Sequence, residues 1–146
     1  MSEKHIETTL VLLKPDALEK NLIWEISKRF EDALMKIIWM KMMKLDDKII
    51  EEHYSHLLDK PFFPDIKEYM TSWNVVAMAI AWNNVVQRVR NLMWPTNPKD
   101  AAKWTIRWDF AESIDRNIIH WSDSIENAEI ELKRFFKEWE VSFIEE

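Results

Sequence analysis

The stretch TLVLLKP, residues 9–15, decides the fold class of this chain. Its apolar run Thr9–Leu13 carries no charge and predicts a short buried strand, which Pro15 ends because proline has no backbone N–H for a sheet. Directly after it, Leu22, Ile26 and Phe30 recur at helical spacing. A buried strand followed by an amphipathic helix is typical of folds that mix helices with a covered sheet.

Two more apolar runs predict strands further along the chain. One is Val75–Ala81, and the other is Ile37–Met43, whose methionine-rich composition is equally compatible with a buried helix. Helices are expected around these runs: one capped by Asp46 or Asp47 with Ile50, His53 or Tyr54, and Leu57 on its apolar face, one around Ile66–Met70, and one carrying Val86, Val89 and Met93 up to Pro95.

The C-terminal part begins with Ile118–Ile119, which predict a fourth strand. A last helix is expected to start at Asp123, where Glu126 three residues later forms a pair like a capping box. Because strands and helices alternate, we predict an α/β or α+β fold with a small sheet covered by helices. No linker, repeat or low-complexity tract interrupts this pattern, so residues 1–146 are expected to form one domain.

The composition excludes several classes of function. The chain has 20 Lys and Arg against 26 Asp and Glu, a net charge of −6 that disfavours general binding of nucleic acid or anionic membranes. It has no Cys, which excludes disulfides and thiolate chemistry, and no Gly, which excludes Gly-rich phosphate loops. Apolar runs stay far below the roughly 18 residues of a membrane span. With a polar N-terminal sequence, a cytoplasmic location is expected.

Residues 94–117 form a long stretch without clear periodicity, and long loops in compact domains are commonly functional. Between Arg88 and Arg116, six basic side chains outnumber four acidic ones within an otherwise acidic chain. Because arginine forks match phosphate oxygens, a polyanionic ligand is one interpretation. A solvated surface loop with incidental charges is the other.

The histidines are the candidates for chemistry. His120 follows the predicted strand Ile118–Ile119 and precedes a helix start, where it can act as a nucleophile or base near an anion. A structural histidine is the alternative. His53 and His56 lie three residues apart and can ligate a metal, although the nearby sequence lacks a third His or Cys ligand. His5, in the polar N-terminal stretch, is expected to be inert.

Four segments carry a resemblance to a known family: TLVLLKPDAL at 9–18, EEHYSHLLDKPFFPDIKEYMTS at 51–72, PTNPKDAAKWTIRWDFA at 95–111 and RNIIHWSDSIENAE at 116–129. Together the chain resembles a nucleoside diphosphate kinase, without a gap from about Thr8 to Phe136. The resemblance implies a ferredoxin-like βαββαβ sandwich whose four-stranded antiparallel sheet is covered by helices. It also implies transfer of the γ-phosphate from a nucleoside triphosphate to a diphosphate through a phosphohistidine, with ping-pong kinetics.

The same resemblance assigns roles to individual side chains. His120 matches the phosphorylated nucleophile, Glu131 the carboxylate that orients its ring, and Phe62 the ring on which the base stacks. The implied catalytic group is His120, Glu131, Lys14, Tyr54 and Ser122, and the implied nucleotide contacts are Lys14, Phe62, Arg90, Thr96, Arg107 and Asn117. Mg²⁺ is expected on the nucleotide phosphates, with Asp123 at most an indirect ligand.

Nucleoside tri- and diphosphates are therefore the expected partners, together with further copies of the chain. The resemblance implies a dimer as the minimal unit and a hexamer or tetramer built through the loop at residues 94–117. Two alternatives remain: an inactive nucleotide-binding or assembly protein with the same fold, and a histidine phosphocarrier whose acceptor is a protein. Phe62 and Asn117 favour a nucleotide acceptor over the phosphocarrier.

The chain departs from the family pattern wherever that pattern has glycine. Another residue, most often tryptophan, stands at each of these positions: Trp24, Trp39, Trp73, Trp82, Trp94, Trp104, Trp108, Trp121, Ala17, Asn21, Leu34, Asp65 and Asp115. Complete loss of one residue type predicts an engineered or reconstructed glycine-free variant. Where the backbone needs a positive φ, such a replacement is expected to cost about 1–3 kcal/mol.

Overall fold

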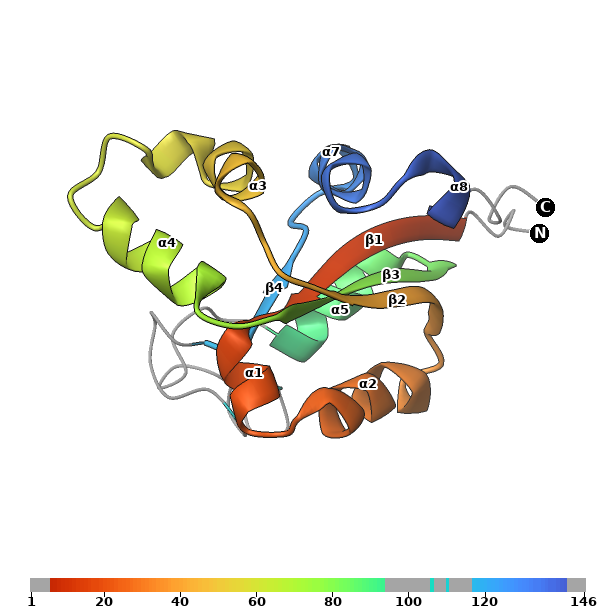
Figure 1. The fold of residues 1–146 in the computed structure, drawn as a ribbon. Coiled ribbons are helices and arrows are strands. Elements are labelled where there is room, and N and C mark those ends of the chain that lie inside the picture. Colours follow the sequence, from red (N-terminus) through yellow and green to blue (C-terminus); the bar gives the residue numbers. More distant parts are fainter. Residues whose placement is uncertain (1–5, 94–105, 107–109, 111–116, 142–146) are drawn as a thin grey trace.

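A four-stranded antiparallel sheet runs through the computed structural model, which describes residues 6–93, 106, 110 and 117–141 (Figure 1). Its strands are β1 (Ile6–Leu13), β2 (Lys36–Met43), β3 (Val75–Asn83) and β4 (Ile119–Trp121). They lie in the order β2-β3-β1-β4, so the strands that are consecutive in the chain are partly separated in the sheet. This arrangement confirms the predicted ferredoxin-like class and shows that the methionine-rich run is a strand.

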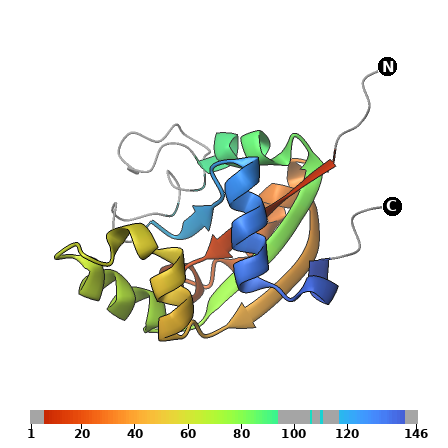
Figure 2. The same cartoon turned by 90° about the horizontal axis from the view of Figure 1, so that it is seen from above.

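Helices cover both faces of the sheet (Figures 1 and 2). One face packs against α1 (Pro15–Glu19), α2 (Ile23–Asp32) and α5 (Val85–Met93). The other packs against α3 (Asp47–His53), the short helix η1 (Ser55–Leu57), α4 (Phe63–Thr71), α7 (Ile125–Phe135) and α8 (Glu138–Val141). Figure 2 shows α7 lying across the strands, with α3, η1 and α4 grouped beside β4.

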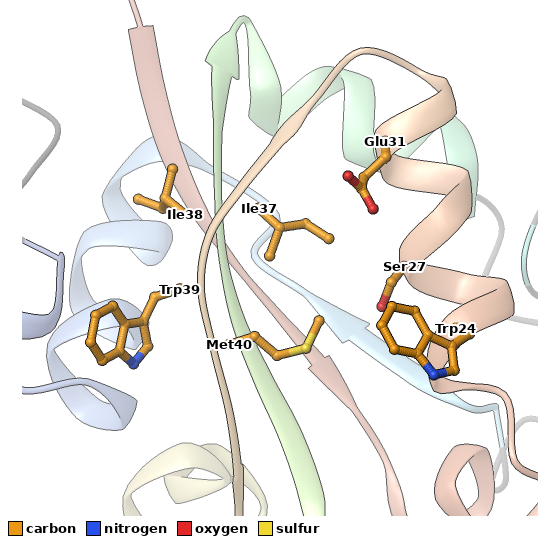
Figure 3. Close-up of a pocket in the computed structure, with 7 residues that line it drawn as sticks. All are labelled: Trp24, Ser27, Glu31, Ile37, Ile38, Trp39 and Met40. Atoms are coloured by element: carbon orange, nitrogen blue, oxygen red, sulfur yellow. The ribbon is translucent and has the colours of Figure 1, made fainter.

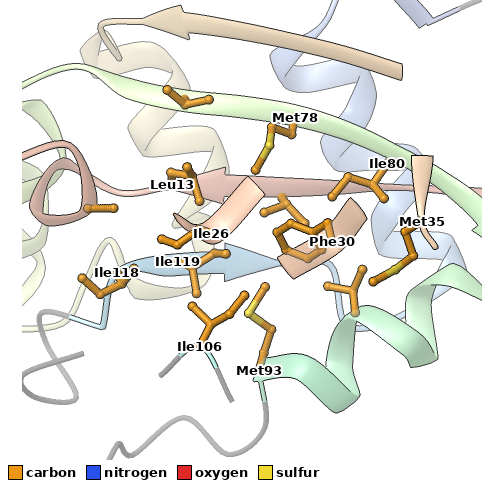
Figure 4. Close-up of a cluster of buried hydrophobic side chains, with 14 of the residues drawn as sticks. Leu13, Ile26, Phe30, Met35, Met78, Ile80, Met93, Ile106, Ile118 and Ile119 are labelled. Carbon is orange, nitrogen blue, oxygen red and sulfur yellow. The ribbon is translucent and has the colours of Figure 1, made fainter. Parts of the chain in front are cut away.

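Residues Thr9–Leu13 of β1 are buried on both faces of the sheet because their side chains alternate between two cores. Leu10 and Leu12 belong to the cluster under α3, α4 and α7, whereas Val11 and Leu13 belong to the cluster under α2 and α5. Figure 4 shows the second cluster, where Ile119 of β4 lies with Leu13. The continuous apolar run therefore has a physical cause: over Thr9–Leu13, neither face of the strand meets water.

Three predicted boundaries are corrected by the structure. The last helix is capped by Ser124 rather than Asp123, because the Ser124 hydroxyl accepts a hydrogen bond from the Asn127 N–H at 3.1 Å. Ile118 lies outside β4, in the turn before it. Helix α3 ends at His53, so Leu57 belongs to the separate helix η1. In addition, the short helix α1 has no counterpart among the predicted helices.

Most of the described residues that stand where the family pattern has glycine have an ordinary backbone conformation. Among the described residues, positive φ angles occur at Asn21, Leu34, Asn84 and Ile118. The described tryptophans at former glycine positions (24, 39, 73, 82 and 121) therefore have ordinary backbone, and the predicted strain does not apply to them. Trp94, Trp104, Trp108 and Asp115 lie outside the described residues. Asn tolerates a positive φ well, which leaves Leu34 as the costly replacement of this set.

Leu34 ends α2 in a Schellman motif. Its N–H donates to the Glu31 carbonyl at 2.9 Å, and the next N–H, of Met35, donates to the Phe30 carbonyl at 3.0 Å. The motif requires the left-handed φ of 66° at Leu34, a conformation that a side chain with a Cβ disfavours. Because the Leu34 side chain is 68% exposed, little packing offsets this cost.

Replacing Leu34 with glycine should therefore stabilise the protein. We expect Leu34→Gly to raise the free energy of unfolding by about 1 kcal/mol, measured by urea denaturation. The matched control is Asn21→Gly, at φ 58°, where we expect a change of only a few tenths of a kcal/mol. Equal changes in both variants would contradict a cost specific to leucine.

Candidate active site

His120 lies in the middle of β4, opposite Leu12 of β1. Leu12 faces the α3 and α7 side of the sheet, so the His120 ring points the same way. Its Nε2 lies 2.7 Å from Oε1 of Glu131 on α7, and the Ser122 hydroxyl donates to the other oxygen, Oε2. The Glu131 carboxylate thus connects His120 with Ser122, so three of the predicted catalytic residues lie together. The His120 side chain keeps 24% of its surface exposed.

The Glu131 carboxylate fixes the tautomer of His120. Burial alone would raise the pKa of Glu131, but the hydrogen bond and charge of His120 and the hydrogen bond from Ser122 outweigh it and lower that pKa. An ionised carboxylate only accepts hydrogen bonds, so Nε2 of His120 carries the proton. Nδ1 then keeps the lone pair, and it is the nitrogen able to attack phosphorus.

His53 contributes to this site in a way that the sequence pattern did not indicate. Its ring lies edge-on to the His120 ring, with centroids 4.5 Å apart, and its Nδ1 is 3.9 Å from Glu131 Oε1. Nδ1 also lies 2.8 Å from an Arg134 guanidinium nitrogen, so it accepts that hydrogen bond. Burial, followed by the charge of His120, lowers the pKa of His53 to about 3. His53 is neutral at pH 7.

Tyr54 and Lys14 both lie near His53, since the Tyr54 ring contacts it and the charge of Lys14 contributes to the lowering of its pKa. The Tyr54 ring contacts His53 edge-on at 4.9 Å, and burial followed by the charge of Glu131 raises the Tyr54 pKa to about 12. Its hydroxyl is therefore protonated at neutral pH and able to donate a hydrogen bond. The Lys14 ammonium donates to Asn117 Oδ1 at 2.8 Å, which brings together two predicted nucleotide contacts distant in sequence.

Two of the remaining predicted site residues, Phe62 and Arg90, are described by the structure and lie on other elements. Phe62 precedes α4 and is 48% exposed, as a ring that stacks on a ligand must be. Arg90 is a half-buried residue of α5. Neither takes part in the contacts of His120 given above. Thr96 and Arg107 lie outside the described residues.

The only potential metal-ligating group found among the described residues is His53, His120 and Glu131, whose ligand atoms lie within 4.8 Å of one another. His53 thus groups with His120 rather than with His56, which is exposed on η1 and was its expected partner. Two imidazoles and one carboxylate do not suit Mg²⁺, which prefers oxygen ligands. The Arg134 guanidinium at His53 Nδ1 also opposes a cation there.

A hollow of about 440 Å³ lies away from this chemistry, between α2 and β2 (Figure 3). Its lining includes Trp24 and Ser27 from α2, with Ile37 and Met40 from the strand. The lining is mostly apolar and includes none of the site residues discussed above, so we do not assign the catalytic site to it. In the described part of the chain, no helix has the length and apolar character needed to cross a bilayer.

Comparison with known proteins gives a consistent result. Residues 7–141 match the family profile described as nucleoside diphosphate kinase. A nucleoside diphosphate kinase of Acetivibrio thermocellus is 46% identical over 133 residues, which cover 91% of this chain and 98% of that protein. Nucleoside diphosphate kinase B of Bos taurus is 42% identical over 137 residues, covering 94% of this chain and 90% of that protein.

Solved structures agree with the sequence matches. The Aquifex aeolicus nucleoside diphosphate kinase has a TM-score of 0.88 and 33% identity, covering 93% of this chain and 99% of the other. The Halobacterium salinarum enzyme, a halophilic nucleoside diphosphate kinase in complex with CDP, has a TM-score of 0.89 and 37% identity. That match covers 93% of this chain and 91% of the other.

The buried neutral His53 should make the fold sensitive to acid. Because its pKa falls from 6.5 to about 3 on folding, the unfolded chain binds more protons between these pH values. The contribution of neutral His53 to the free energy of unfolding is complete above pH 6.5. It is lost as the pH falls toward 3, at up to about 1.4 kcal/mol per pH unit. The test variant is His53→Gln, whose amide oxygen can accept a hydrogen bond from Arg134. Between pH 6.5 and 4.5, we expect its free energy of unfolding to fall by about 2 kcal/mol less than that of the parent.

Urea unfolding at successive pH values measures this difference. His56→Gln is the matched control, since His56 is exposed, and its curve should follow the parent. Parallel curves for His53→Gln and the parent would refute the assignment of this acid sensitivity to His53. The pKa of Glu131 is also lowered on folding, so protonation of Glu131 lowers the free energy of unfolding further as the pH falls.

Proposed function

Since this chain belongs to the nucleoside diphosphate kinase family, we propose that His120 is the residue that carries the transferred phosphate. Family membership makes the chain a phosphotransferase that moves the γ-phosphate of a nucleoside triphosphate to a nucleoside diphosphate. The observation that carries the proposal is the 2.7 Å contact between His120 Nε2 and Glu131, because it leaves the lone pair on Nδ1.

The proposed reaction has two steps. In the first, the Nδ1 lone pair attacks the γ-phosphorus, an N–P bond forms, and the P–O bond to the β-phosphate breaks, which releases a nucleoside diphosphate. In the second, a terminal β-phosphate oxygen of another diphosphate attacks the same phosphorus, and the N–P bond breaks. Between the steps the phosphorylated ring carries a positive charge, because Nε2 keeps its proton. Glu131 stabilises that charge across the 2.7 Å contact.

The nucleotide is proposed to lie between α4 and the turn before β4. Lys14 and Asn117 are already paired at 2.8 Å, which supports a joint role of the ammonium at the phosphates and the amide at the sugar. The exposed Phe62 ring supports base stacking, which every base can make. Arg90, Thr96 and Arg107 are proposed as further phosphate contacts, by the family resemblance. The CDP complex of the halophilic relative supports a nucleoside diphosphate as ligand.

Mg²⁺ is proposed to arrive on the nucleotide phosphates. When bound, it would neutralise phosphate charge and so favour transfer. The donor set of His53, His120 and Glu131 offers too few oxygens for this ion, and the exposed Asp123 remains an indirect ligand at most. Tyr54 and Ser122 keep their proposed places near the transferred phosphate, Tyr54 as a protonated hydroxyl and Ser122 as a support of Glu131.

The alternative of an inactive nucleotide-binding protein is not favoured. The family match spans nearly the whole chain, and Glu131 and Ser122 keep a coherent hydrogen-bonded arrangement around His120. The phosphocarrier alternative is not favoured either. The exposed Phe62 ring is suited to stacking on a base, which favours a nucleotide acceptor over a protein acceptor.

Self-association is proposed to begin with a dimer through the β2 edge. β2 is an edge strand, which leaves one side of its backbone able to pair with a second copy. Apolar side chains are exposed beside it: Trp24 at 83%, Met40 at 41% and Met42 at 56%. Figure 3 shows Trp24 and Met40 lining the hollow between α2 and this strand. Higher assembly through residues 94–117 stays a prediction from the resemblance.

The phosphohistidine can be tested directly. Incubation with Mg-ATP labelled at the γ-phosphate should leave an acid-labile, alkali-stable label on the protein, and a nucleoside diphosphate should then remove it. His120→Ala should abolish the label, whereas the control variant His56→Ala at an exposed position should keep it. Labelling of His120→Ala as strong as that of the parent would disprove the proposed nucleophile.

The dimer is tested by sedimentation. Met40→Lys places a charge at the proposed contact and should shift the protein toward a monomer in analytical ultracentrifugation. Ile130→Lys is the matched control, because Ile130 is a 55% exposed residue of α7, on the opposite face of the sheet from the hollow. Unchanged sedimentation of Met40→Lys, at concentrations where the parent is a dimer, would exclude the β2 edge as the interface.

A further inference from the structure

The turn before His120 is strained. The Ile119 N–H donates to the Asn117 carbonyl at 2.8 Å, two residues back, and Ile118 between them has a φ of 77°. These features define a γ-turn with a positive central φ, a form that is rare because it is strained. A β-branched residue at its centre adds to the cost. Such a conformation persists only where the surroundings hold it.

Residues 14 and 16 hold this turn from three points. The Lys14 N–H donates to the Ile118 carbonyl at 2.7 Å, and the Lys14 ammonium donates to Asn117 Oδ1 at 2.8 Å. The Ile118 N–H donates to Asp16 Oδ2 at 3.1 Å. Both backbone groups of the strained residue are therefore paired with the segment that follows β1.

Asp16 also connects the turn to α4. Its residue surface is 2% exposed, and its second oxygen, Oδ1, accepts a hydrogen bond from the Tyr69 hydroxyl. Tyr69 lies on α4, the helix that begins directly after Phe62. A buried carboxylate is costly unless each oxygen is paired, and here the partners are a backbone N–H beside the nucleophile and a side chain of the nucleotide-side helix.

We propose that Asp16 is a positioning residue for phosphoryl transfer, whose buried carboxylate fixes the strained Asn117–Ile119 turn to α4 and thereby aims His120. The proposal rests on the proposed function of His120, two residues after Ile118. Removal of the carboxylate lets Ile118 relax to a negative φ, and the direction of the chain entering β4 changes. The attacking nitrogen then moves relative to the γ-phosphorus, and small displacements of this kind are expensive in rate.

Single-turnover phosphorylation by labelled Mg-ATP tests the proposal, together with steady-state kinetics. Asp16→Ala should lower the rate of His120 phosphorylation and kcat by about 10²-fold, with the nucleotide KM within about threefold of the parent. Asp16→Asn should restore most of the rate, because its oxygen can accept from Ile118 and its NH₂ can donate to the Tyr69 oxygen. This rescue and the kcat-against-KM split separate positioning from a loss of fold.

Glu140→Gln is the matched control. Glu140 is also a buried carboxylate that accepts from a backbone N–H, of Lys137, and from a side chain, of Lys41, but it lies on α8. It should keep the parental rate even where stability falls. If Asp16→Ala does not fold, Tyr69→Phe decides: a fall in kcat of severalfold with an unchanged KM supports the tie to α4.

The possible failures are distinguishable. A parent that takes no label overturns the proposed function itself. A parent that labels normally, with a folded Asp16→Ala variant at the parental rate, overturns only the role of Asp16. An unchanged kcat in Tyr69→Phe, where the alanine variant does not fold, overturns it as well.

Discussion

The hydrogen bond between His120 and Glu131 is the interaction on which the site depends, because it joins the sheet to α7 and fixes which nitrogen of His120 carries the proton. A carboxylate that is only 9% exposed must have partners on both oxygens, and His120 and Ser122 supply them. Burial, followed by the negative charge of Glu131, raises the pKa of Tyr54, and burial is also the main reason that the pKa of His53 is lowered. The proposed nucleophile is therefore defined by its partner on α7, and not by its own sequence position alone.

Much of the fold could be predicted from periodicity, because burial on both faces leaves a direct mark on composition. The uncharged runs at β1 and β3 are strands whose alternate side chains enter two different cores. Boundaries set by single hydrogen bonds leave a weaker mark. Asp123 and Ser124 are both good capping residues. The structure shows that the Asn127 backbone N–H donates to the Ser124 hydroxyl, while the Asp123 carboxylate accepts from the Asn127 side-chain amide.

The site was predictable only as far as the family resemblance names its residues. Periodicity marked His53 as a residue on the apolar face of a helix, and its tertiary neighbours His120, Glu131 and Arg134 come from segments far along the chain. Arg134 is accordingly linked to the site through His53, although it lies outside the expected phosphate contacts. The signal that could have identified His53 is its place on a helix face that is otherwise apolar, where an imidazole needs a polar partner.

Loss of glycine affects this scaffold according to backbone geometry and not according to side-chain size. The described tryptophans at former glycine positions have ordinary φ angles, so their bulk is accommodated by exposure, as at Trp24 and Trp73, or by packing against the core, as at Trp82 and Trp121. Ile118 shows the converse: its strain of about 1–3 kcal/mol arises at a residue that is not a replaced glycine. Its fully buried side chain contributes about 1.5–3 kcal/mol, which is of the same size. The core that Figure 4 shows around Ile118 thus offsets the backbone strain two residues before His120. Packing on one face of the sheet and the geometry of the candidate site on the other face are parts of one constraint.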